Sequence, residues 1–259
     1  NPYCNFLGVP VNCGPRGLPL GHNYLYRNQG DGTFKEVTTA GGILKTSKTY
    51  SMTTVTADFD NDGWDDIYVA SDSTPSLLLR NQHNGTFVDE GIERGVGLSN
   101  DGMEQAGMGV AVGDYNLDGS LDIFKTHFSD DTSVLYQNDG KGNFTKRPTS
   151  LPPLLVRKSC ARVADFNGDG FPDIFVGGRV IPGRYTETPQ SYLLINDGKG
   201  NFTDKITSIA PSLQKSGMVT DAAWIDINND KKMDLLVVGE WMPVTVYINA
   251  NGKLANETT

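Results

Sequence analysis

A short acidic motif occurs four times in this chain of 259 residues, at nearly equal intervals. Each copy follows the pattern Asp-x-Asp/Asn-x-Asp-x-x-x-Asp and starts at Asp58, Asp114, Asp165 or Asp226, so successive copies lie 56, 51 and 61 residues apart. Self-similarity at such a period marks an array of similar structural units. This repeat constrains the fold more strongly than any other feature of the sequence.

The chemistry of the motif favours a bound cation. Oxygen-bearing side chains at motif positions 1, 3 and 5 can point to one centre when a Gly at position 6 allows a sharp turn, and the carbonyl of position 7 can add another oxygen. Ca²⁺ takes six to eight such hard oxygen ligands. The first three copies have Gly at position 6, as Gly63, Gly119 and Gly170. The sequence therefore predicts three calcium loops.

An EF-hand is excluded by the spacing and the flanks. The last acid stands at motif position 9, whereas an EF-hand loop has its last ligand at position 12 and helices on both sides. Here the flanking segments, such as 55–57 and 67–69, have the composition of strands. An alternative is that Asp, Asn and Gly only form polar hairpin turns. A fourth calcium site is left open, because Lys231 replaces the Gly and the adjacent Lys232 adds a second positive charge.

A second repeated element alternates with the acidic loop. Apolar runs lead into Asn- and Gly-rich segments that are typical of tight hairpins, at 28–34, 81–87, 138–144, 196–202 and, in degraded form, 249–253. Each unit then has four short strands, which in the first full unit we expect near 52–57, 66–71, 76–80 and 86–90.

Repeated four-stranded units of this length predict an all-β fold, a β-propeller of four-stranded blades with little helix. The chain would contain about four full blades plus a half blade at 24–37. We expect an N-terminal Cys-containing segment at 1–21, propeller repeats over 22–259, and a loop at the insertion 178–190. Four and a half blades leave open edges, so the chain is expected to be part of a larger propeller or of an assembly.

Two stretches resemble a known family. Segment 109–114 (Gly-Val-Ala-Val-Gly-Asp) and the loop after it resemble the FG-GAP/VCBS repeat of integrin α-subunit propellers. Segments 25–37 and 57–69 resemble the ASPIC/UnbV group, which is similar to cartilage acidic proteins. The resemblance covers nearly the whole chain after residue 20. It implies a propeller of up to about seven blades, an extracellular location and a scaffold for adhesion or recognition without catalysis.

The resemblance also implies which residues hold calcium, namely motif positions 1, 3, 5 and 9 by their side chains and position 7 by its carbonyl. These residues are Asp58, Asp60, Asp62, Trp64 and Asp66 in loop 1; Asp114, Asn116, Asp118, Ser120 and Asp122 in loop 2; Asp165, Asn167, Asp169, Phe171 and Asp173 in loop 3; and Asp226, Asn228, Asp230, Lys232 and Asp234 in loop 4.

Composition excludes some classes of partner. The net charge of −9 argues against nucleic-acid binding, and no segment has the character of a membrane span. Cys4 and Cys13 flank a Gly/Pro-rich loop at 5–12 and are expected to form a small disulfide, which suits a secreted protein. Cys160 is expected to be a buried free thiol. Because millimolar calcium is found outside cells, we expect an extracellular or cell-surface location.

Three classes of function remain. We favour a non-catalytic recognition or adhesion module for protein or glycan, with Arg179, Arg184, Tyr185 and Trp241 as the contact residues, because Arg and aromatic side chains dominate recognition. The second is a structural subunit that self-associates through open blade edges. The third is a carbohydrate-active enzyme. It is disfavoured because the three histidines stand in no catalytic motif, which leaves the non-loop carboxylates Asp72, Asp130, Asp131, Glu187 and Glu240 as candidates.

Overall fold

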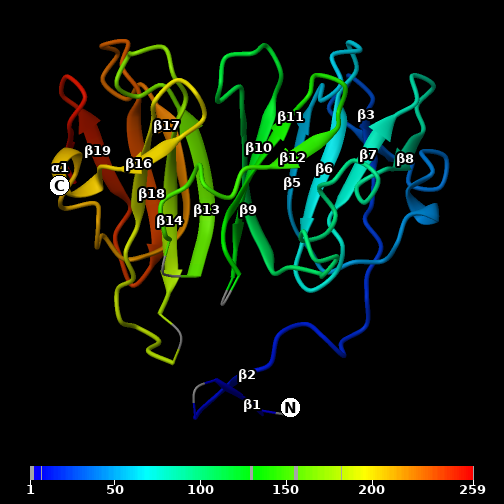
Figure 1. Cartoon of the computed structure of the whole chain (residues 1–259), viewed down its shortest axis with the longest axis horizontal. Coiled ribbons are helices and arrows are strands. Elements are labelled where there is room, and N and C mark those ends of the chain that lie inside the picture. The colour runs from blue at the N-terminus through cyan, green and yellow to red at the C-terminus, as the bar shows by residue number, and fades with distance from the viewer. Residues whose placement is uncertain (1–2, 7, 129–130, 155–156, 182, 259) are drawn as a thin grey trace.

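The protein is built from antiparallel sheets that follow one another along the chain (Figure 1). The computed structural model describes residues 3–6, 8–128, 131–154, 157–181 and 183–258. Four sheets in this part have four strands each, in simple consecutive order, and we number them repeats 1 to 4.

Repeat 1 comprises β5 (Ser51–Ala57), β6 (Asp66–Ser71), β7 (Leu77–Asn81) and β8 (Phe87–Asp89); repeat 2 comprises β9 (Gly107–Gly113), β10 (Asp122–His127), β11 (Val134–Asn138) and β12 (Phe144–Lys146); repeat 3 comprises β13 (Arg157–Ala164), β14 (Asp173–Val180), β15 (Tyr192–Asn196) and β16 (Phe202–Asp204); repeat 4 comprises β17 (Met218–Ile225), β18 (Asp234–Glu240), β19 (Thr245–Asn249) and β20 (Leu254–Asn256). In repeat 1 the strands agree with the predicted ranges to within a residue. The predicted half blade is a two-stranded sheet, β3 (Tyr26–Asn28) with β4 (Phe34–Glu36), which we call the half-repeat.

The hydrophobic core lies between consecutive sheets rather than inside one of them. One apolar cluster packs Leu25 and Ile43, which lie on either side of the half-repeat, against repeat 1, and three more clusters join repeat 1 to 2, repeat 2 to 3, and repeat 3 to 4. Repeats 2 to 4 thus each bury one face on the repeat before them. This is expected because strands in which apolar and polar residues alternate have one apolar face that must be covered. The first strands of repeats 3 and 4, β13 and β17, are also joined by hydrogen bonds. Arg162 Nε of β13 donates to the Ala222 carbonyl of β17 (2.8 Å), and Ser159 Oγ donates to the Val219 carbonyl (2.6 Å).

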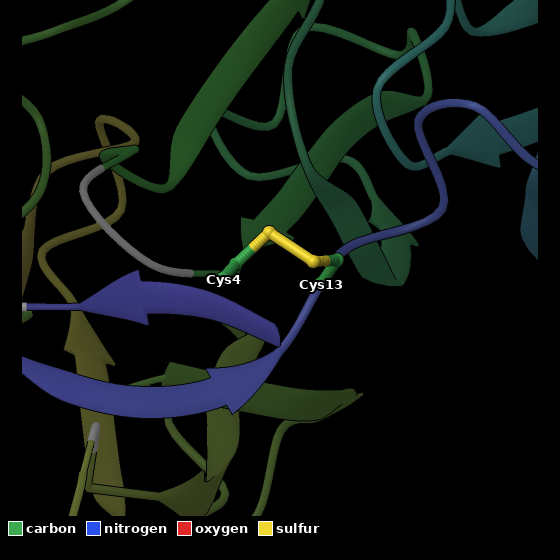
Figure 2. The surroundings of a disulfide bond; sticks show 2 residues. All are labelled: Cys4 and Cys13. Atoms are coloured by element: carbon green, nitrogen blue, oxygen red, sulfur yellow. A yellow bond between two sulfur atoms is a disulfide. The ribbon is translucent and has the colours of Figure 1, made fainter. Parts of the chain in front are cut away.

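The N-terminal segment forms a hairpin of its own, β1 (Tyr3–Phe6) with β2 (Val9–Asn12). The predicted disulfide is present: Cys4 and Cys13 are bonded, with their Cα atoms 4.9 Å apart, and Figure 2 shows the bond closing the open end of this hairpin. The prediction of a loop over 5–12 was wrong for most of its length, because the Gly/Pro-rich composition hid a pairing that the disulfide supports. Cys160 is buried and free, as expected.

The insertion 178–190 is also not entirely a loop. Strand β14 continues to Val180 because β13 is long enough to pair with it, with Lys158 opposite Gly178. Gly178 has a structural role here, since a Cβ at this position would lie 2.3 Å from the Gln190 carbonyl oxygen. Helix is scarce in the described residues, as predicted. The longest helix, α1 (Ile206–Ile209), has four residues and is far too short to cross a bilayer.

One side chain in the core is an unexpected charge. Lys125 on β10 is 1% exposed, its Nζ donates to Ser76 Oγ at 3.4 Å, and it lies over the Tyr136 ring, 5.3 Å from the centroid. Burial and, to a smaller extent, the charge of Lys146 lower the pKa of Lys125 to about 7, against the opposing effect of Asp131. The folded protein therefore favours the neutral amine at a pH where the unfolded chain still binds a proton.

We expect the free energy of unfolding to rise with pH above neutrality. Between a folded-state pKa of about 7 and the ordinary value of 10.5, the unfolded chain binds more protons at Lys125, so higher pH favours the fold. From pH 7 to 9 the contribution of Lys125 is on the order of 2 kcal/mol. Urea unfolding of wild type and Lys125→Met at several pH values checks this. The variant should lose about half of the slope, because Lys158, whose burial lowers its pKa to about 8, supplies the rest. Equal slopes in the two proteins would contradict it.

Candidate metal centre and recognition surface

All four acidic loops close in the same way. In loop 1 the Asp58 carboxylate accepts backbone N–H groups from Asp62 (3.0 Å) and Gly63 (2.8 Å). The corresponding donor pairs reach Asp114, Asp165 and Asp226 at 2.8–3.1 Å. In loop 4 the position of Gly63 is taken by Lys231, which adopts a φ of 68° against 88° for Gly63. The missing Gly therefore does not prevent this turn, although a positive φ is strained for Lys.

The acid at motif position 9 ties each loop to the hairpin of its own repeat. These Asp residues are at most 2% exposed, and each accepts the backbone N–H of the first hairpin Asn at 2.7–2.9 Å; the pairs are Asp66 with Asn81, Asp122 with Asn138, Asp173 with Asn196 and Asp234 with Asn249. Burial raises the pKa of Asp66 to about 6 and those of Asp122 and Asp173 to about 7. The sequence suggested a metal ligand here and missed this structural role.

Loop 1 gathers the most carboxylate oxygens. Asp58, Asp60 and Asp62 each offer an oxygen within 4.8 Å of the others. Asp60 is the most enclosed, with a side chain 5% exposed, and burial raises its pKa. Both of its oxygens are buried, and Oδ2 forms an ion pair with the Arg80 guanidinium. His83 Nε2 lies 2.6 Å from a carboxylate oxygen of Asp62, and this contact lowers the pKa of Asp62.

Loops 2 and 3 hold an Asn at motif position 3. Asn116 donates to Asp118 at 2.7 Å, and Asn167 donates to Asp169 at 2.9 Å. The Asn116 Oδ1 atom and the Asp173 Oδ2 atom are buried without a hydrogen-bond partner. Orphaned buried oxygens carry a free-energy cost that a hard cation would remove. The donor sets of loops 1 to 3 therefore fit calcium.

Loop 4 differs because a lysine already lies beside its carboxylates. The Lys232 ammonium is 3.8 Å from Asp230 and donates to Asn251 at 3.0 Å. Among the described side chains of this loop, no buried oxygen is without a partner. Loop 4 therefore keeps the turn of the other loops but has a positive charge beside its carboxylates.

Two of the four predicted recognition residues meet at one carboxylate, and a third follows it in the sequence. Arg179 donates to Glu240 Oε1 at 2.5 Å, and the Tyr185 hydroxyl donates to Oε2 at 3.0 Å. These bonds hold the pKa of Glu240 below its usual value. The neighbouring Trp241 is 79% exposed and has a φ of 57°, which is strained for a large aromatic residue. Arg184 instead pairs with Glu187 at 3.4 Å.

A hollow of about 440 Å³ adjoins this group where the first strands of the repeats converge. Arg179 lines it together with Asp72, Lys158, Arg162 and Asp221. Charges of both signs therefore surround a space large enough for a small polar ligand.

The carboxylates considered for catalysis are engaged in other contacts. Asp72 accepts from Ser73 (2.9 Å), and Asp131 accepts the Ala106 N–H (2.8 Å), while Glu187 and Glu240 form the ion pairs given above. Asp130 lies outside the described residues.

The repeated units of this sequence match a known family of repeats. The model for the FG-GAP-like repeat matches residues 16–69, 58–125, 126–176 and 183–237, which together cover most of the chain. The chain belongs to the FG-GAP-like repeat family. This confirms the resemblance drawn from the acidic loops. The FG-GAP repeats suggest a non-enzymatic repeat protein.

Relatives of this FG-GAP protein include cartilage acidic protein 1. The Mus musculus protein is 29% identical over 194 residues, which are 72% of this chain and 29% of that protein. The Homo sapiens protein is 27% identical over 192 residues, which are 72% of this chain and 28% of that protein. The chain thus spans less than a third of the length of these relatives.

Two solved structures are similar at low sequence identity. One is an Agrocybe aegerita lectin described as recognising non-reducing terminal N-acetylglucosamine, with a TM-score of 0.47 and 18% identity, covering 90% of this chain and 72% of the lectin chain. The other is the V. cholerae biofilm matrix protein Bap1, with a TM-score of 0.39 and 18% identity, covering 80% of this chain and 30% of that chain.

Proposed function

We propose that this chain is a calcium-stabilised β-propeller module that recognises a protein or a glycan outside the cell, without catalysis. The observation that carries the recognition proposal is the cluster around Glu240. An aromatic side chain that is largely exposed and conformationally strained contributes little to stability, so its presence is better explained by binding. Arg179 and Tyr185 are held by Glu240 and thus lose little conformational entropy when a ligand binds.

Calcium would be held by loops 1 to 3 through motif positions 1, 3 and 5 and the carbonyl of position 7, with the position 9 Asp supporting the loop or adding a ligand. The orphaned oxygens of Asn116 and Asp173 and the acidic cluster of loop 1 support this. In loop 4 the ammonium of Lys232 would compete with the ion. When bound, the ion would neutralise the carboxylates of each loop.

Repeats packed face to face are compatible with propeller blades, and we propose that residues 22–259 form blades of one propeller, with 1–21 as a disulfide-closed extension. The disulfide supports an oxidising location outside the cell, and so does the similarity to cartilage acidic protein 1.

We expect Trp241→Ala to weaken binding to the recognised ligand at least about tenfold, because exposed aromatic anchors commonly supply more than 1.4 kcal/mol of binding free energy. The measurement is a glycan array and a panel of extracellular matrix proteins, followed by titration of the best ligand. Arg179→Ala should act in the same direction.

The matched control is Tyr24→Ala, which removes an aromatic ring that is 70% exposed and stands just before β3, outside the repeat that carries Glu240. It should bind the ligand like the wild type. All three variants should melt within about 2 °C of the wild type, because exposed loop side chains contribute little to stability. Undiminished binding by both Trp241→Ala and Arg179→Ala would refute the proposed surface.

A further inference from the structure

Loop 1 is the only one of the four acidic loops with a carboxylic acid at motif position 3. This position is Asp60 in loop 1 and is Asn116, Asn167 and Asn228 in loops 2 to 4. In loops 2 and 3 the Asn amide donates to the Asp at position 5. A carboxylate has no proton to donate, so Asp60 and Asp62 of loop 1 repel each other unless a cation lies between them.

Arg80 supplies such a cation from within the chain. It lies on β7, and its Nη2 atom forms an ion pair with Asp60 and is 3.5 Å from Asp62 Oδ2. The Asp60 side chain is 5% exposed, so this pair is largely shielded from water on the carboxylate side. Burial raises the pKa of Asp60, and the charge of Arg80 opposes that rise.

The other three repeats carry no cation at the place of Arg80. The residue before the hairpin Asn is Gln137 in repeat 2, Ile195 in repeat 3 and Ile248 in repeat 4. Strand register confirms the equivalence, because each of these residues pairs with the middle residue of the last strand of its repeat. Among the four repeats, the one with an acid at position 3 is thus the one with a cation before its hairpin Asn.

We propose that Arg80 competes with calcium for loop 1, an inference that rests on the calcium site proposed above. The guanidinium contacts carboxylate oxygens of motif positions 3 and 5, which are the positions that would coordinate the ion. Calcium binding therefore has to release Arg80 from Asp60. When calcium is scarce, Arg80 neutralises part of the charge of the loop, and its presence lowers the calcium affinity of loop 1.

The test replaces Arg80 by the residue that repeat 2 has at the equivalent place. Arg80→Gln should fold, because the side chain is 31% exposed and glutamine is polar and fairly long. The matched control is Arg27→Gln. Arg27 precedes the hairpin Asn of the half-repeat, and residues 1–30 contain no Asp or Glu that could form an acidic loop.

Terbium luminescence can follow loop 1 separately from the other loops. Tb³⁺ takes hard oxygen ligands as Ca²⁺ does, and it luminesces when a nearby tryptophan transfers excitation energy to it. Trp64 stands at motif position 7 of loop 1. The part of the signal that is lost in Trp64→Phe, which keeps the backbone carbonyl, belongs to loop 1. Displacement of Tb³⁺ by calcium then gives the calcium affinity of loop 1 in each protein.

We expect loop 1 of Arg80→Gln to bind calcium roughly tenfold more tightly than the wild type, and Arg27→Gln to bind it like the wild type. The coupling between Arg80 and calcium is reciprocal. Arg80→Gln should therefore melt about 3–5 °C below the wild type in chelator, and within about 1 °C of it in saturating calcium.

Two results would overturn this inference and leave the calcium proposal intact. One is an equal calcium affinity of loop 1 in Arg80→Gln and the wild type. The other is an equal loss of melting temperature in chelator and in calcium, because Arg80 would then be a structural contact only. If neither protein gave a signal that depends on Trp64, loop 1 would not be a calcium site, and the inference and the calcium proposal for this loop would both be wrong.

Discussion

Removing calcium with a chelator should lower the melting temperature of the protein by roughly 15 °C or more. A ligand that binds only the folded state at one hundred times its Kd contributes about 2.7 kcal/mol, so three loops contribute about 8 kcal/mol. For a chain of this size each kcal/mol moves the melting temperature by about 2–4 °C. Differential scanning calorimetry with and without chelator measures the shift, with metal analysis to verify that the ions have left.

Two matched substitutions test where the calcium binds. Asp62→Ala removes a carboxylate from loop 1, and Asp230→Ala removes the equivalent carboxylate from loop 4, where Lys232 already supplies a positive charge. We expect the first to reduce bound calcium by about one ion and the second to reduce it little. If the melting temperature did not change in chelator, the loops would be polar turns that calcium does not stabilise. If the two variants lost equal amounts of bound calcium, Lys232 would not weaken calcium binding by loop 4.

Replacing Asn138 by Ala should cost about 4 kcal/mol of stability. Its side chain is buried and donates to the Phe59 and Leu121 carbonyls at 2.7 and 3.0 Å, while its Oδ1 accepts the N–H groups of Gly140 and Gly142. Truncation leaves at least two buried carbonyls without a donor, and each of them costs about 1–3 kcal/mol of stability. It also creates a small cavity. Urea unfolding gives the difference from wild type.

The same substitution in repeat 1 is the natural control. Among the described residues, the Asn81 side chain donates only to the Asp65 carbonyl (3.1 Å) and accepts only from the His83 N–H (3.0 Å), since no acidic loop precedes repeat 1 there to offer a second carbonyl. Asn81→Ala should therefore cost about 1 kcal/mol. If both variants lost the same stability, the bond from Asn138 to the preceding repeat would contribute nothing.

The sequence predicted the strands because their signals are local. The interval between loops, the turn residues and the apolar runs are all contained within one unit, and together they specify four strands and the half-repeat. The extension of β14 to Val180 was missed because it depends on the length of its partner β13. The hairpin β1–β2 was missed because Gly and Pro favour loops unless a disulfide holds the strands together.

The site was only partly predictable, since its decisive contacts join distant residues. The sequence indicated the acidic side chains and the four recognition residues, but not that Glu240 would hold Arg179 and Tyr185, which lie 61 and 55 residues away. It also gave no sign that Arg80 and His83 would meet the carboxylates of loop 1. The Asn at the start of each hairpin was visible as a repeated residue, and its bond to the preceding repeat could have been suspected from that repetition alone.

The hydrogen bond from Asn138 to the preceding loop has counterparts from Asn196 to the Tyr115 carbonyl (2.8 Å) and from Asn249 to the Phe166 carbonyl (2.5 Å), and this bears on how such a protein can evolve. Since the donor and the acceptor occupy the same register positions in every repeat, a duplicated unit would meet a matching surface on both sides. Gene duplication could then lengthen the array by whole units without a new interface having to arise. A damaging substitution at one junction would, for the same reason, leave the other junctions intact, so that individual repeats are free to diverge in the loops that contact ligands.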